Sequence, residues 1–185
     1  EIEGEESGLK QRDWRATGSN FAPAVVVGKL VHKAIQRWLF PGEEGYLSLM
    51  KAALAREGIL ALEQQKLVLA ETGILLDRFK EHSIFAEIMI SDIKRHETPF
   101  SYETAGKYFD TGIIDLLYRM GENWHLVDFK TDDVADEVEL ENKIQIYRDQ
   151  LQRYRQASIK LLGSTPFTAI CFLNFMGQVK IAEIN

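Results

Sequence analysis

The chain has 185 residues, of which 45% are hydrophobic, so it supports one sizeable core and excludes two large independent domains. Its 22 Lys and Arg face 28 Asp and Glu, and the formal net charge of −6 excludes a protein that holds nucleic acid by bulk positive charge. Cys171 is the only cysteine, which excludes a disulfide framework, a four-cysteine zinc site and a four-cysteine iron–sulfur cluster. Any metal would therefore need oxygen and imidazole ligands.

The start of the sequence and the length of its apolar runs predict where in the cell the protein is located. No apolar run reaches the roughly 20 residues that cross a bilayer, so we expect no membrane association. The sequence begins at Glu1 without an initiator Met, a basic region or an apolar signal core, which predicts a piece of a longer chain in a reducing cytoplasm. Residues 1–20 are polar and predict an irregular lead-in whose Trp14 docks on the body.

Helical patterns dominate the first half of the chain. Residues 28–40 repeat apolar side chains at helical spacing and stop at Pro41-Gly42, which predicts a helix. Two more helical patterns cover residues 43–57 and 60–80, the second with a break near Gly73. Together, residues 43–80 predict a helical insert packed on the main body.

The pattern changes after His82, where apolar and polar residues alternate in short runs. This alternation predicts strands over residues 93–103, 108–120 and 124–130. The three strands follow one another closely, as in antiparallel hairpins.

The last part of the chain returns to helical spacing over residues 137–162 and stops at Gly163. Residues 167–175 and 178–184 then predict two closing strands. The order of elements predicts one domain of the α/β class, with a mixed central sheet flanked by helices and the long helix against one face.

Two acidic residues and a lysine stand out in the predicted hairpin. Alternation along the strand puts Asp128 and Lys130 on one face and turns Phe129 away. If residues 121–122 form a two-residue turn, Asp115 lies directly opposite Asp128, where like charges destabilise a sheet. The apolar neighbours of both acids indicate burial, and a bound Mg²⁺ or Mn²⁺ would resolve the conflict. A surface hairpin with scattered charges stays open as the plain alternative.

Four further residues are candidates for a site. Glu97 can add a third carboxylate from the preceding strand, and His32 is a candidate metal ligand on the first helix. Gln150 and Tyr154 share one face of the long helix. Each has a structural alternative: a surface acid, a satisfied helix histidine, and a tyrosine packed on the sheet.

Five short motifs follow one another in the chain. They are Gly28-x-x-x-His32, Glu97-x-Pro99-Phe100, Gly112-x-x-Asp115, Asp128-x-Lys130 and Gln150-x-x-x-Tyr154. This series resembles the RecB-type nucleases of the PD-(D/E)xK superfamily, and it looks closest to the C-terminal nuclease domain of AddA or RecB helicase–nuclease subunits. Some branches of the family carry four cysteines for an iron–sulfur cluster. Since Cys171 stands alone, the resemblance is to the branch with no iron–sulfur cluster.

The resemblance implies roles for individual residues. It implies a metal site with these ligands: His32, Asp115, Asp128 and the main-chain carbonyl of Phe129. Mg²⁺ would be the ion, with Mn²⁺ as a substitute, and Glu97 would support a second ion or an ordered water. Lys130 would orient or activate the attacking water and neutralise charge on the phosphate. Gln150 and Tyr154 would hold the DNA backbone or brace the site.

The implied activity is that of a metal-dependent DNA exonuclease, acting in double-strand-break end processing and recombinational repair. The implied partner is a helicase, either as a domain of the same chain or as a separate subunit. The predicted long helix also carries cations that would contact DNA: Lys143, Arg148, Arg153, Arg155 and Lys160. Two alternatives stay open. One is a stand-alone RecB-like exonuclease, and the other is a degenerate nuclease fold that binds DNA or a partner without cutting.

Overall fold

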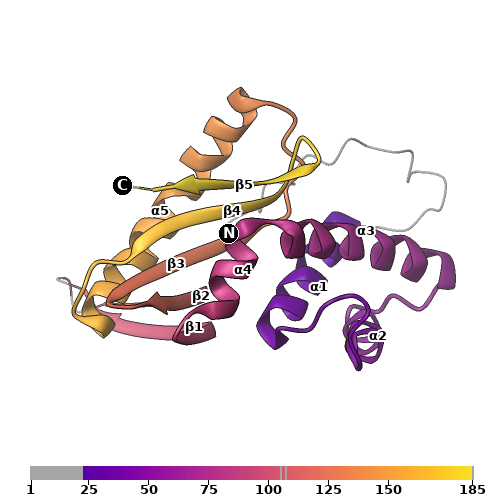
Figure 1. Cartoon of the computed structure of the whole chain (residues 1–185), viewed down its shortest axis with the longest axis horizontal. Helices are drawn as coiled ribbons and strands as arrows, with labels where there is room; N and C mark the ends of the chain where they lie inside the picture. The colour runs from indigo at the N-terminus through magenta and orange to yellow at the C-terminus, as the bar shows by residue number, and fades with distance from the viewer. Residues whose placement is uncertain (1–22, 105, 107, 185) are drawn as a thin grey trace.

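The computed structural model describes residues 23–104, 106 and 108–184, so the predicted lead-in of residues 1–20 lies outside it. In chain order the elements are α1 (Pro23–Arg37), α2 (Tyr46–Arg56), α3 (Leu62–Glu81), α4 (Ser83–Ile90), β1 (Ile93–Glu103), β2 (Phe109–Met120), β3 (Asn123–Lys130), α5 (Glu137–Leu162), β4 (Phe167–Phe175) and β5 (Gln178–Glu183). Figure 1 shows the strands as one twisted sheet, with α5 along one side and α1 to α4 grouped on the other.

The sheet has the strand order β1-β2-β3-β4-β5. β2 is antiparallel to both β1 and β3, β3 and β4 run parallel, and β5 is antiparallel to β4. A parallel pair needs a long crossover connection, and α5 supplies it between β3 and β4. The predicted mixed sheet flanked by helices, with the long helix against one face, is confirmed.

Each face of the sheet has its own apolar core. Val127 and Phe129 of β3 pack with the core that α1 to α4 complete. Leu126 faces the other way and packs with Leu151 of α5 and with β4. Because successive side chains of a strand alternate, β3 is buried on both faces, as expected of a central strand.

The first helix starts earlier and ends earlier than predicted. α1 begins at Pro23, because Pro is favoured in a first helical turn and because Val26 and Val27, which follow it, are buried in the core. It ends at Arg37, since Trp38 takes a left-handed conformation with φ of 50°. The Trp38 and Leu39 amides then donate to the carbonyls of Ile35 and Ala34, the arrangement that commonly closes a helix.

Two other helix predictions differ from the structure. α3 runs without interruption through Gly73, so the predicted break is wrong. α4 was not predicted, because almost all of its residues are apolar and a uniformly apolar segment has no helical period to recognise. It matters for the fold because Ile84 and Ile88 of α4 are buried in the core.

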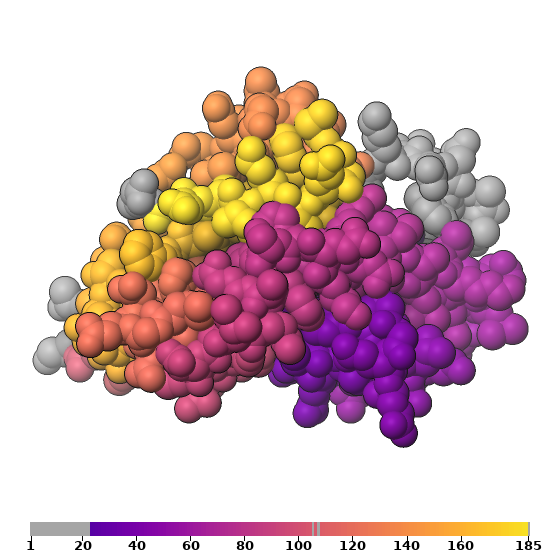
Figure 2. Space-filling model, in the orientation of Figure 1, coloured from indigo at the N-terminus to yellow at the C-terminus, as the bar shows by residue number. Residues whose placement is uncertain are grey.

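In the space-filling view of Figure 2, the helices of the first half and the closing strands occupy different parts of the surface. Among the described helices, none has both the length and the apolar character needed to cross a membrane.

Candidate active site

The site begins where the β2–β3 hairpin opens. Residues 121–122 form the turn as predicted, and the pairing runs from Met120–Asn123 to Leu116–Val127. This register would place Asp115 opposite Asp128, but the pairing ends one residue before them. Instead, Oδ2 of Asp115 accepts a hydrogen bond of 2.8 Å from the Phe129 amide. The carboxylate thus takes the place of a main-chain partner at the point where the strands separate.

A second irregularity lies across from Asp115 on β1. Residues on both sides of Glu97 pair with β2, whereas Glu97 and Asp115 do not pair. Glu97 has φ of 48°, a left-handed conformation that is strained for a residue other than glycine and clusters at functional sites. Beyond this point β2 changes its alternation: Ile114 belongs to the α5-side core and Leu116 to the opposite core. The strained backbone therefore interrupts a regular ladder at the two acids.

Three ligand atoms come together beside this interruption. One atom each of His32, Glu97 and Asp115 lie within 4.8 Å of one another, and Nδ1 of His32 is 3.5 Å from Oδ2 of Asp115. Gly28 allows α1 to approach, because a Cβ there would lie 3.1 Å from Oγ1 of Thr131, just beyond the end of β3. The glycine one turn before His32 thus brings the imidazole to the acids.

Asp128 is the most deeply buried of the acids, with 1% of its surface exposed. Nζ of Lys130 lies 2.9 Å from its Oδ2. The contact is an ion pair without hydrogen-bond geometry, so Oδ2 has no hydrogen-bond partner among the described residues. Burial raises the pKa of Asp128 to about 6, opposed by the charge of Lys130 and reinforced by that of Asp115. A bound cation would stabilise the ionised form of this carboxylate.

Lys130 is held by side chains of α5. It donates to Oε1 of Gln150 over 3.0 Å, and Nε2 of Gln150 donates to the Tyr154 hydroxyl over 2.7 Å. Nζ of Lys130 also lies 4.2 Å from the centre of the Tyr147 ring, a cation–π distance. The structure therefore brings the predicted Gln150 and Tyr154 to the site, where they brace the lysine.

Asp132 is a residue of this site that the sequence reasoning missed. It is 6% exposed and accepts hydrogen bonds from the Tyr147 hydroxyl (2.9 Å) and from Nζ of Lys143 (2.8 Å). It fixes the ring on which Lys130 rests and anchors α5 to the segment after β3. Its place two residues after Lys130 was the available signal.

The electrostatics of the cluster follow from its crowding. Burial lowers the pKa of His32, but the contact with Asp115 and the charge of Asp128 outweigh it and leave the pKa raised. Burial and the charge of Asp115 raise the pKa of Glu97 above its ordinary value, against the lowering charges of His32 and Lys33. The charge of Asp115 thus makes both Glu97 and Asp128 harder to ionise, which a bound cation would reverse.

The donor set fits a hard divalent cation. Carboxylate oxygens suit Mg²⁺ and Mn²⁺, and an imidazole is a better ligand for Mn²⁺ than for Mg²⁺. The buried Asp128 carboxylate beside the like charge of Asp115 is the observation that most calls for a cation. The close group of ligand atoms differs from the expected ligand set, since it contains Glu97, and Asp128 lies next to the group rather than in it.

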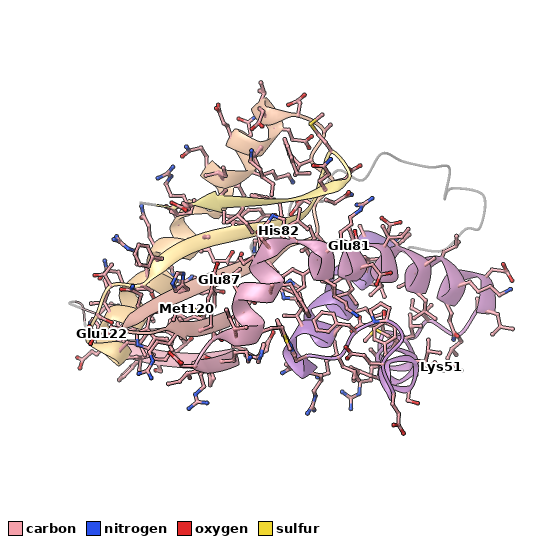
Figure 3. All side chains as sticks on the ribbon, viewed as in Figure 1. Lys51, Glu81, His82, Glu87, Met120 and Glu122 are labelled. Atoms are coloured by element: carbon pink, nitrogen blue, oxygen red, sulfur yellow. The ribbon has the colours of Figure 1, made fainter. Side chains whose placement is uncertain are left out.

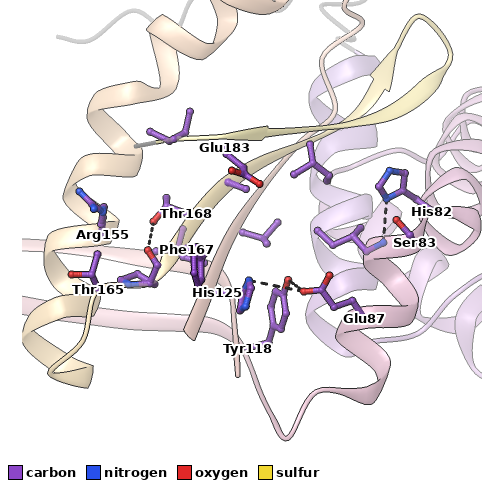
Figure 4. Close-up of a pocket in the computed structure, with 17 residues that line it drawn as sticks. His82, Ser83, Glu87, Tyr118, His125, Arg155, Thr165, Phe167, Thr168 and Glu183 are labelled. Atoms are coloured by element: carbon purple, nitrogen blue, oxygen red, sulfur yellow. Dashed lines mark hydrogen bonds and ion pairs between the residues drawn. The ribbon is translucent and has the colours of Figure 1, made fainter. Parts of the chain in front are cut away.

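A separate cavity of about 420 Å³ lies along the sheet near the turn end of the β2–β3 hairpin (Figure 4). Its polar lining includes His82, Glu87, Tyr118, His125 and Glu183. The Tyr118 hydroxyl donates to Oε1 of Glu87 over 2.7 Å, so these groups satisfy one another. Arg155 also lines this cavity, whereas the candidate metal ligands and Lys130 lie outside it.

The fold and the site define the class of protein. The sequence profile of the PD-(D/E)XK nuclease superfamily matches residues 5–169, and the chain belongs to this superfamily. The resemblance seen in the five motifs is confirmed, and the chain is a nuclease-superfamily domain with a mixed sheet.

Two individual proteins are similar to it. An ATP-dependent helicase/nuclease subunit of Natranaerobius thermophilus is 38% identical over 64 residues, which are 33% of this chain and 5% of that protein. The crystal structure of a putative exonuclease from Eubacterium rectale superposes with a TM-score of 0.59 at 14% identity, covering 90% of this chain and 60% of that one. The structural likeness supports the fold, and the chain spans only a small part of its curated relative.

Proposed function

We propose that the chain is a divalent-metal-dependent DNA exonuclease domain. The observation that carries the proposal is the buried Asp128–Lys130 ion pair beside the group formed by His32, Glu97 and Asp115. A module that only binds DNA has no use for a buried Asp128 carboxylate beside the like charge of Asp115, because such a group costs stability.

The proposed ligands of the cation are His32, Asp115, Asp128 and the main-chain carbonyl of Phe129. A divalent cation held there supplies Lewis acidity toward a phosphate oxygen. Glu97 holds a second ion or orders a water molecule at the edge of the group. The Phe129 amide fixes the Asp115 carboxylate, so this ligand is positioned before any substrate arrives.

Lys130 acts on the phosphate and on the attacking water. Its ammonium neutralises the negative charge that builds on the phosphate and orients the water for in-line attack. A new bond forms between the water oxygen and phosphorus, and the bond to the 3′-oxygen breaks, leaving a 5′-phosphate and a 3′-hydroxyl. Gln150 and Tyr154 keep Lys130 in place during this step.

We further propose that this domain works with a helicase domain or subunit in DNA end processing and recombinational repair. The similarity to part of a protein described as a helicase/nuclease subunit supports it. The net charge of −6 also supports it, since an acidic domain gains from a motor that delivers the strand.

The direct test is cleavage of end-labelled single- and double-stranded DNA with Mg²⁺, Mn²⁺ or EDTA. Asp128→Asn should abolish metal-dependent cutting and Lys130→Met should lower its rate by about 10²–10³-fold, while both proteins stay folded. Glu122→Gln is the matched control, because this exposed carboxylate lies in the hairpin turn away from the site (Figure 3). Binding of DNA without cutting under either metal would instead identify a degenerate nuclease fold.

A further inference from the structure

A groove of about 240 Å³ lies between α2 and α1, the helix that also carries His32. Its floor is apolar, with Leu30 and Leu49 among the lining residues. Its charged lining consists of Lys29, Lys33, Arg37, Arg56 and Glu57. Four cations against one acid is an unusual gathering for a chain whose net charge is −6.

Most of this positive charge is unneutralised. Lys29 forms an ion pair of 2.6 Å with Glu57, so these two cancel. Lys33 donates to the neutral Gln36 over 2.7 Å. Within residues 23–104, 106 and 108–184, neither Arg37 nor Arg56 takes part in a salt bridge. The groove therefore carries three positive charges beyond its one acid–base pair.

The row of cations leads away from the site. Lys29, Lys33 and Arg37 are spaced four residues apart, so they share one face of α1 with a rise of about 6 Å between successive members. Lys33 directly follows His32 in α1, so the groove shares this helix with a candidate metal ligand.

Three of the five α5 cations predicted to contact DNA are engaged in other contacts. Lys143 pairs with the buried Asp132 at 2.8 Å, and Arg153 pairs with Asp110. Nζ of Lys160 lies 4.4 Å from the centre of the Tyr102 ring. These side chains stabilise the packing of α5 on the sheet rather than presenting free charge.

We propose that the α1–α2 groove holds the phosphate backbone of the DNA strand next to the bond that is cut, through Lys33, Arg37 and Arg56. This inference rests on the proposed nuclease function and specifies where its substrate lies. Phosphate oxygens match guanidinium donors in charge and geometry, and the apolar floor leaves the cations as the only polar attraction. The contacts are to the backbone, so they carry no preference for base sequence.

The test is the salt dependence of binding by the 185-residue chain to a labelled single-stranded oligonucleotide, measured by fluorescence anisotropy in EDTA. For single strands, each cation that contacts a phosphate contributes about 0.7 to the slope of log K against log salt. The double variant Arg37→Ala/Arg56→Ala should therefore lower the slope by about 1.4, and Arg37→Lys/Arg56→Lys should largely restore it.

The matched control is Lys51→Ala/Lys66→Ala, which removes the same charge from outside the groove. Lys51 is exposed on α2 (Figure 3), and Lys66 is exposed on α3, where it pairs with Glu63. Its slope should stay close to that of the parent chain. An unchanged slope in the groove variant, or an equal loss in the control, would overturn the groove assignment.

The same proteins separate this inference from the nuclease proposal. A parent chain that cuts DNA, together with a groove variant that binds like the parent, contradicts the groove alone. A parent chain that cuts under neither Mg²⁺ nor Mn²⁺, yet loses the expected slope in the groove variant, contradicts the nuclease proposal and supports the groove.

Discussion

Asp128 responds to pH in the opposite way from most aspartates of folded proteins. Its pKa is raised to about 6 from the ordinary 3.8, so the folded state binds the proton more tightly than the unfolded state does. The resulting stabilisation is present at low pH and is lost as pH rises from about 4 to about 6. The metal-free protein therefore carries a destabilising carboxylate at neutral pH, and this is the cost of a preformed site.

Replacing Asp128 by Asn should remove this cost. Because Asn does not titrate, we expect the stability of Asp128→Asn relative to the parent chain, measured by urea unfolding in EDTA, to rise by up to about 3 kcal/mol between pH 4 and pH 7. Glu122→Gln, a change at an exposed acid, should leave stability unchanged. A difference between Asp128→Asn and the parent that does not grow with pH would refute the assignment of the raised pKa.

Lys130 offers a second prediction for a single side chain. Lys130→Met keeps the length of the side chain and removes the ammonium that lies near Asp128 and Gln150. Loss of one electrostatic group at a developing phosphate charge should lower the cleavage rate by about 10²–10³-fold, with DNA affinity little changed. Lys51→Met controls for loss of a surface charge. A loss below about tenfold, equivalent to about 1.4 kcal/mol, would contradict the role.

At the scale of elements, the β1–β2 hairpin depends on Gly112. A Cβ at this position would lie 2.7 Å from two atoms of the Phe100 ring, which is buried and packs edge-on against Tyr154. Close packing therefore explains the glycine in the Gly112-x-x-Asp115 motif, since the absence of a side chain lets β1 and α5 pack against β2 beside the site.

Gly112→Ala should accordingly destabilise the protein by about 1–3 kcal/mol, because the Phe100 ring must move within a packed core. Gly73→Ala is an informative control: Gly73 lies in α3 with nothing within 4 Å of an added Cβ. There, alanine should stabilise the helix by about 0.5–1 kcal/mol. Urea unfolding of both variants checks the prediction, and equal shifts in the same direction would argue against the close approach at Gly112.

At the scale of the whole molecule, the metal should hold the helical half and the sheet together. His32 comes from α1, Glu97 from β1 and Asp115 from β2, so an ion bound by them links elements far apart in the chain. The repulsion among the acids, which the metal-free protein tolerates, would disappear in the same step.

Mn²⁺ or Mg²⁺ should therefore raise the thermal midpoint, with a stabilisation of about 2.7 kcal/mol at a concentration about one hundred times Kd, and EDTA should reverse it. Asp115→Asn should lose most of the effect, whereas Glu44→Gln, at an exposed acid between α1 and α2, should keep it. An equal metal response in Asp115→Asn would place the ion elsewhere. Differential scanning fluorimetry of the parent chain and the two variants, with and without metal, measures these shifts of the thermal midpoint.

Much of the fold follows from the sequence because its signals are local. Turn residues and alternation predict β1 and α5 to their end residues, and the two-residue turn at 121–122 determines the register of β2 with β3. The same dependence on local signals explains why α4 and the start of α1 were not predicted. α4 has no polar face, so its sequence shows no helical period. At the start of α1, Val26 and Val27 favour a helix only because the core buries them.

The sequence by itself determined that Asp128 and Lys130 lie side by side, since they share a face of the strand by simple alternation. Only the tertiary structure decided how they are arranged. The strained φ of Glu97, the Phe129 amide on Asp115 and the support of Tyr147 by Asp132 all join segments distant in sequence. Local spacing cannot encode such contacts, because they exist only once two cores have packed the sheet between its helices.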